Sequence, residues 1–149
     1  MQPSTLKFLQ AADDASNVES PPKFDWAGLR SRLLDLQPHL ERIADRGFTL
    51  DDKVQDASFF GDLAIVKSSE RPNWFEYVFA LRFSNFGKLF TTCNSSSEQL
   101  PRDIAARLVE AAITAGFVYV EPEALEEPYA GENQIFSGAT WWERYFDYT

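Results

Sequence analysis

Residues 74–94 read WFEYVFALRFSNFGKLFTTCN, and this stretch decides the fold. Its first ten residues alternate between two faces, as a β-strand does, and one face carries Phe75, Tyr77, Phe79, Leu81 and Phe83. Residues 85–87 predict a hairpin turn, after which residues 88–94 form a returning strand. Residues 58–67 alternate in the same way, and residues 48–55 are a short edge-strand candidate. Since no crossover helix separates these runs, they predict an antiparallel meander.

Two amphipathic helices flank this meander. The first begins after Asp25, a good N-cap, and its apolar stripe comprises Trp26, Leu29, Leu33, Leu36, Leu40 and Ile43. Pro38 interrupts the stripe without changing its phase, so we expect a kinked helix or two abutting helices, ending near Gly47. The second helix begins at Pro101 and ends in a Schellman motif at Gly116. Its stripe comprises Ile104, Leu108, Ala111, Ala112 and Ala115.

The remaining segments complete the prediction. Residues 117–120 are expected to add a short strand, and Thr140 is expected to cap a short C-terminal helix. We therefore predict an α+β fold, in which an antiparallel sheet of about four strands carries helices mainly on one face. Residues 1–23 are rich in Pro and polar residues, and we expect a flexible leader there. Residues 24–149 then form a single domain.

The charge of the chain limits its partners. Its 149 residues include 14 basic and 23 acidic ones, for a net charge of -9. Seven acidic residues and a single basic one fall between Glu121 and Thr149, so the C-terminal fifth is the distinct acidic part. A field of this sign repels phosphate backbones and anionic lipid, so we expect neither nucleic-acid nor membrane binding. It attracts a protein partner with a basic surface.

Residues that carry chemistry are scarce. The chain has one histidine, His39, and one cysteine, Cys93, which lie far apart in the sequence. One of each is too few for a zinc site, and no glycine-rich phosphate loop is present. We therefore expect no metal, no cofactor and no catalytic residue, and an enzyme is not the favoured class. A single cysteine permits no intramolecular disulfide, and we see neither a secretory signal nor an apolar run, so we expect a cytoplasmic protein.

The aromatic residues suggest two kinds of surface. The face that begins at Phe75 is expected to be core beneath the helices, with a ligand groove as the alternative. The terminal helix has aromatic residues on two sides. We expect it to dock over the edge of the core, and the alternative is an exposed aromatic patch that anchors a partner. The sequence leaves open which of these aromatic residues are exposed. The candidate binding residues are Glu121, Glu123, Glu126, Glu127, Glu132, Trp141, Trp142, Tyr145 and Tyr148.

These features favour a non-enzymatic protein-binding module that sequesters a basic partner. An immunity protein that blocks a basic bacterial toxin is one concrete form of this hypothesis. The alternatives are a secretion-chaperone-like dimer and a small-molecule or lipid-binding domain that uses the aromatic sheet face. The sequence leaves open whether the protein is a monomer or a homodimer.

Overall fold

The computed structural model describes residues 1–149 and confirms the α+β class. Its sheet contains β1 (Thr49–Asp51), β2 (Phe59–Ser68), β3 (Phe75–Ser84), β4 (Leu89–Cys93) and β5 (Val118–Tyr119). The strands lie in the order β1-β2-β3-β4-β5, one more strand than expected. All neighbours are antiparallel except β4 and β5, which are parallel because a helix separates them in the chain.

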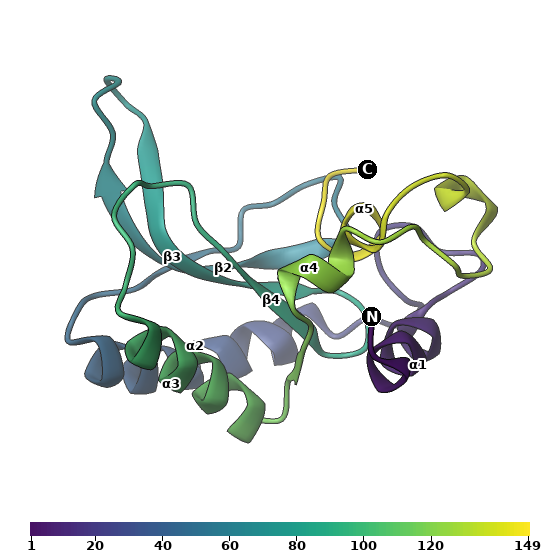
Figure 1. Cartoon of the computed structure of the whole chain (residues 1–149), viewed down its shortest axis with the longest axis horizontal. Helices are drawn as coiled ribbons and strands as arrows, with labels where there is room; N and C mark the ends of the chain where they lie inside the picture. The colour runs from purple at the N-terminus through teal and green to yellow at the C-terminus, as the bar shows by residue number, and fades with distance from the viewer.

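Two long helices cover one face of the sheet. Figure 1 shows α2 (Trp26–Ala44) and α3 (Arg102–Thr114) beneath the strands, while α4 (Pro122–Leu125) and α5 (Trp141–Tyr145) lie on the opposite side. The Asp25 side chain accepts a hydrogen bond from the Gly28 N–H, as expected of an N-cap. Pro38 lies inside α2, which is one continuous helix. Leu36 and Leu40, on either side of Pro38, are buried in the same core. The C-cap residue of α2 is Asp45, whose φ of 52° lies in the left-handed region, so the helix ends before Gly47.

The end of α3 follows its prediction. The Gly116 N–H donates to the Ile113 carbonyl and the Phe117 N–H donates to the Ala112 carbonyl, which together make a Schellman motif. Gly116 has a φ of 100°, which an L side chain rarely adopts. The motif turns the chain back under the sheet, so that Phe117 joins the main core and β5 reaches the edge of β4.

The main core lies between the two helices and the sheet. The helices contribute Leu33, Leu36, Leu40, Leu108 and Ala112, and the sheet contributes Leu63, Ile65, Phe79, Leu81, Phe83 and Phe90. Truncating a fully buried leucine here, such as Leu40, is expected to cost about 2–5 kcal/mol. Phe79, Leu81 and Phe83 are therefore core residues. These three side chains cannot line a ligand groove, which was the alternative interpretation of this face.

A β-bulge changes the expected face of two aromatic residues. The pairing of β2 with β3 shifts between Ile65 and Val66, opposite Val78. Val78 and Phe79 are consecutive, yet both belong to the main core. The alternation therefore slips by one residue, and Tyr77 lies on the face away from α2 and α3, where its hydroxyl donates to Asp51. The prediction that Phe75 and Tyr77 share the core face with Phe79 is wrong for this reason.

A second core lies on the other side of the sheet and includes the first residues of the chain. The helix α1 (Pro3–Ala12) covers this core and buries Leu9 completely. Its other members include Phe59, Phe86, Leu89, Leu125, Trp141, Tyr145 and Phe146. Gly87 has a φ of 62°, and a Cβ there would lie 2.5 Å from that of Ala12, so the turn after β3 needs glycine to accept α1.

Arg144 holds the segment that follows α1. Its guanidinium is fully buried, pairs with Asp13 at 2.7 Å, and donates to the carbonyls of Asp14, Asn17 and Val18. The structure therefore differs from the expected flexible leader over residues 1–23, because α1 and this ion pair dock the segment against the C-terminal residues. The sequence gives little indication of this docking. Three of the four groups that accept hydrogen bonds from Arg144 are backbone carbonyls, which every residue has.

Candidate functional site

The five predicted glutamates lie at the surface between β5 and the 3-10 turn η1 (Gln134–Phe136). Only Glu127 is within ion-pair distance of a cation, the amino group of Met1 at 2.8 Å. The carboxylates of Glu121, Glu123, Glu126 and Glu132 are exposed and have no cation within 4.0 Å. Their charges are therefore not neutralised within the chain.

The structure brings three of these glutamates together. Glu121, Glu123 and Glu127 line one hollow of about 490 Å³. Its other lining residues are Met1, Gln2, Thr5, Tyr119 and Ala124. Glu132 lies apart and lines a smaller hollow with Asp13. Burial raises the pKa of the Tyr119 phenol, so this side chain remains a neutral hydrogen-bonding group beside the carboxylates.

Two of the predicted aromatic anchors are core residues, which corrects that part of the prediction. Trp141 and Tyr145 are 0% exposed. Thr140 and Glu143 form a capping box that sets the start of α5, and the Trp141 and Tyr145 rings then stack at 5.8 Å. The Tyr145 hydroxyl donates to the Leu9 carbonyl on α1. The Trp141 ring also packs against the Tyr129 ring at 4.8 Å, and both Trp141 and Tyr145 belong to the second core, which includes Leu9 of α1.

The other two aromatic anchors remain at the surface. Trp142 is half-buried and lies 5.6 Å from the Arg82 guanidinium and 5.8 Å from the Phe146 ring. Tyr148 is 63% exposed, and its ring lies 5.3 Å from the Phe59 ring in an edge-on arrangement. Trp142 and Tyr148 are therefore the two predicted aromatic residues that a partner can reach.

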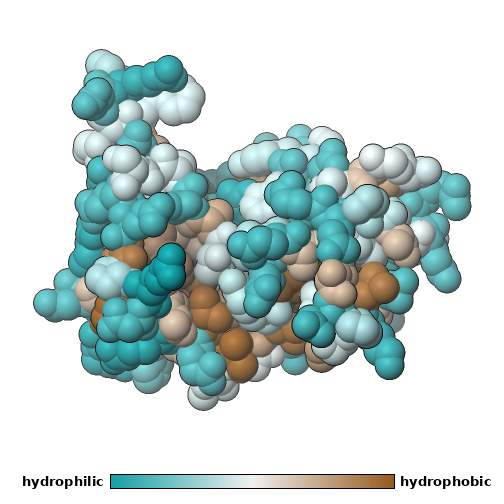
Figure 2. Space-filling view, viewed as in Figure 1, coloured by the Kyte–Doolittle hydropathy of each residue, from teal (hydrophilic) through white to brown (hydrophobic).

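The most exposed aromatic surface lies elsewhere, on the β2–β3 hairpin. Trp74 and Phe75 are 62% and 66% exposed at the end of this hairpin. Figures 1 and 2 show the hairpin standing clear of the rest of the molecule, on the side of the sheet away from α2 and α3. The strands extend beyond the helices that cover their other end, and this extension leaves both rings in solvent. The turn residues before Trp74 predicted the hairpin itself. They do not predict its exposed end, which depends on how far β2 and β3 extend beyond α2 and α3.

Arg82 joins the C-terminal segment to the face of the sheet that points away from α2 and α3. Its guanidinium binds both carboxylate oxygens of Asp62, at 2.9 and 3.1 Å, and donates to the Phe146 carbonyl. It also lies 4.0 Å above the Phe59 ring. Burial alone lowers the pKa of Arg82, but the hydrogen bonds that Arg82 donates to Asp62 outweigh it and the pKa is raised. Because Arg82 and Asp62 neutralise each other through two hydrogen bonds, this ion pair has a structural role.

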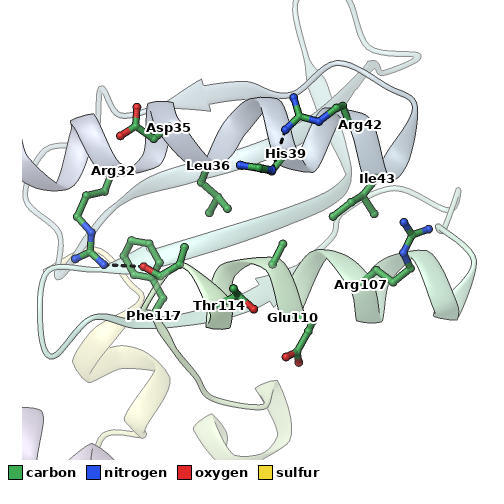
Figure 3. Close-up of a pocket in the computed structure, with 12 residues that line it drawn as sticks. Arg32, Asp35, Leu36, His39, Arg42, Ile43, Arg107, Glu110, Thr114 and Phe117 are labelled. Atoms are coloured by element: carbon green, nitrogen blue, oxygen red, sulfur yellow. Dashed lines mark hydrogen bonds between the residues drawn. The ribbon is translucent and has the colours of Figure 1, made fainter.

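The largest hollow lies on the opposite side of the molecule, between α2 and α3. Figure 3 shows this groove of about 780 Å³, with Leu36, Ile43 and Phe117 toward its floor. Its charged and titratable side chains are Arg32, Asp35, His39, Arg42, Arg107 and Glu110. Arg32 donates to the Ala115 carbonyl and stacks over the Phe117 ring at 4.5 Å. Three arginines against two carboxylates make this groove a poor site for a basic partner.

His39 and Cys93 are not brought together. His39 lines the α2–α3 groove, where its Nδ1 accepts a hydrogen bond from Arg42 at 2.8 Å, whereas Cys93 lines a different hollow beside β4. Burial, followed by the nearby Asp62 charge, raises the pKa of the Cys93 thiol to about 11. A thiol with this pKa is a poor nucleophile at neutral pH. The arrangement of a Cys/His catalytic pair is therefore not formed.

The structure also bears on metal binding and on the crossing of a membrane. No group of three or more His, Cys, Asp or Glu side chains is arranged to hold a metal ion. None of the helices combines the length and apolar character that crossing a membrane requires.

No family model, curated protein or solved structure matches this chain.

Proposed function

We propose that the protein is a non-enzymatic binding module that captures a basic protein partner on the acidic surface between β5 and η1. The observation that carries this proposal is the absence of any cation beside Glu121, Glu123, Glu126 and Glu132. Exposed carboxylates of one sign attract an oppositely charged protein over a distance, and they raise its association rate.

Binding also needs contacts that hold the partner after it arrives. Trp142 and Tyr148 supply aromatic surface at the C-terminal end of the chain. Aromatic side chains are frequent hot spots in interfaces, whereas surrounding charges contribute more to the association rate. We infer that the glutamates steer the partner and that these two rings anchor it.

The form of this function that we favour is inhibition by occlusion, as in an immunity protein that covers the basic working surface of a toxin. We place the protein in the cytoplasm, where its single cysteine stays reduced. An inhibitor of this kind works as a monomer or a homodimer, whereas a secretion-chaperone-like protein would bind an extended segment as a dimer.

The experiment is a capture from host lysate with two matched charge variants. The first variant changes Glu121, Glu123, Glu126 and Glu132 to Gln. The control changes Asp35 and Asp45 to Asn and Glu70 and Glu110 to Gln, which removes four exposed and unpaired carboxylates elsewhere. Both variants have the same net charge, so a difference between them reports the position of the charges.

We expect the wild type and the control variant to retain a stoichiometric basic protein at about 50 mM NaCl, near a Debye length of roughly 14 Å. The first variant should lose it. Equal retention by both variants would contradict the proposed surface, and capture of no basic protein by the wild type would contradict the proposed class.

A further inference from the structure

The edge of β4 is only partly covered by β5. β4 pairs with β3 from Phe90 to Cys93, but its pairing with the parallel β5 involves only Leu89 and Phe90. The chain then leaves the sheet toward α4. Thr92 and Cys93 therefore have β3 on one side and no paired strand on the other. Thr91 is already in contact with the segment after β5, because its hydroxyl donates to the Val120 carbonyl at 2.8 Å.

The hydrogen bonds of β5 show which backbone groups face this open edge. The Val120 N–H donates to the Phe90 carbonyl at 2.9 Å, so the backbone polar groups of Phe90 point away from β3. Because these directions alternate along an antiparallel strand, the N–H and C=O of Thr92 point the same way. Asn94 follows directly after the end of β4. The Thr92 N–H and C=O thus face outward, with no strand to pair with.

This edge also lacks the usual protection against strand pairing. Natural edges are interrupted by Lys, Pro or a bulge, but residues 91–94 contain neither Lys nor Pro, and their pairing with β3 has no register shift. The opposite edge differs, because β1 is followed directly by Asp52 and Lys53. The open edge of β4 is therefore the better template for an added strand.

A hollow of about 510 Å³ runs along this edge. Pro122 and Trp142 form its wall on the side of the sheet away from α3, and Leu100 and Ala105 form its wall on the α3 side. Successive side chains of an extended segment point in opposite directions, so they would pack against one wall and then the other. Arg102, at the start of α3, is the one charged residue that lines the hollow, whereas Glu121 and Glu123 flank Pro122.

We propose that the open edge of β4 at Thr92 and Asn94 takes an extended segment of the basic partner as an additional strand. The segment carries apolar side chains toward Trp142 and Leu100 and basic side chains toward Glu121 and Glu123. Backbone hydrogen bonds supply affinity and the two walls supply specificity, as in other strand-addition complexes. This inference rests on the proposed function, for which it specifies the mode of binding.

The test begins with a random library of 12-residue peptides selected on the whole protein. Enriched peptides are expected to alternate apolar residues with Lys or Arg. With ¹⁵N-labelled protein, the bound peptide should slow amide hydrogen exchange at Thr92 and Asn94 at least tenfold. Peptides N-methylated at alternate residues should bind about tenfold more weakly when the methyl groups face β4, which corresponds to roughly one lost hydrogen bond.

Two variants at the same position complete the test. Thr92→Val keeps the outward N–H and should bind normally, whereas Thr92→Pro removes this N–H and should weaken binding about tenfold. Proline at this position removes no bond to β3, because the lost N–H points away from it. The N-methylated peptides give the same information without any change to the protein.

The outcomes separate this inference from the proposed function. Basic peptides that bind in a salt-sensitive way but leave the Thr92 and Asn94 amides unprotected would overturn strand addition and leave the acidic surface supported. A selection that enriches no basic peptide would overturn both. Peptides that protect residues of the α2–α3 groove would overturn the proposed location.

Discussion

Replacing Arg144 with Met should destabilise the protein more than any surface change. The guanidinium is fully buried and makes four hydrogen bonds, one to the Asp13 carboxylate and three to backbone carbonyls between Asp14 and Val18. Removing one partner of a buried ion pair costs about 3–5 kcal/mol, because the other charge stays buried. Asp13 would keep hydrogen bonds from Tyr129 and the Glu132 N–H, so we expect a loss of about 4 kcal/mol and not the upper limit.

Urea denaturation followed by tryptophan fluorescence measures this loss. With a slope of about 2 kcal/mol per molar urea, the midpoint should fall by about 2 M. Arg144→Lys keeps the charge but cannot reach all four acceptors, so about two lost bonds should cost roughly 2 kcal/mol. Trypsin should cleave faster after Lys23 in both variants, because the segment that follows α1 loses its attachment.

A double-mutant cycle with Asp13→Asn identifies the cause. The coupling between the two sites should be about 1.5–3 kcal/mol, the range for hydrogen bonds to charged groups. If Arg144→Met lost less than about 1 kcal/mol, well below the cost of a broken buried pair, or if tryptic cleavage did not change, the claim that this ion pair docks residues 1–23 would be refuted.

Three further predictions concern pH, the thiol and the hairpin. Burial alone raises the pKa of Asp13, but the hydrogen bonds from Tyr129 and Arg144 outweigh it and hold the pKa below the ordinary 3.8. Its contribution to stability is therefore complete above pH 3.8 and is lost as the pH falls through the lowered value, so acid unfolding monitored by circular dichroism should be less steep in Asp13→Asn. The Cys93 thiol, with a pKa of about 11, should react with a disulfide reagent at pH 7.5 about a hundredfold more slowly than an unperturbed thiol, and fast labelling would contradict the raised pKa. Trp74→Ser and Phe75→Ser should each change stability by less than about 0.5 kcal/mol in thermal denaturation, because both rings are exposed, and a larger loss would mean that they pack on the protein.

The sequence specified the main core well, because periodicity reports which side of an element is apolar. The stripe that contains Leu33, Leu36 and Leu40 and the alternation of Phe79, Leu81 and Phe83 both meet in that core. The caps at Asp25 and Thr140 depend on local chemistry that a few residues carry. These features could be predicted because each is determined by neighbours in the chain.

The features that the sequence did not reveal depend on distant contacts. The docking of α1 requires Arg144 to meet carbonyls more than a hundred residues away, and a carbonyl has no residue-specific signal. The burial of Trp141 and Tyr145 also depends on distant contacts, because the second core joins them to Leu9, Phe86 and Leu125. The bulge at Val78 likewise depends on the register with β2, and it moved Tyr77 and Phe75 to the other face.

The candidate site was predicted in part. The glutamates lie at the surface where the charge distribution placed them, and three of them share one hollow. The open edge of β4 was not predicted, because it exists only where the two-residue β5 stops short of Thr92.

The most direct test of the proposed function is the dissociation constant between the protein and its captured basic partner, measured from 50 to 500 mM NaCl for the wild type and both charge variants. Affinity should fall steeply with salt for the wild type and the control variant, and the variant without Glu121, Glu123, Glu126 and Glu132 should bind weakly with a much flatter salt dependence. Equal salt dependence in all three proteins would contradict the claim that this acidic surface captures the partner.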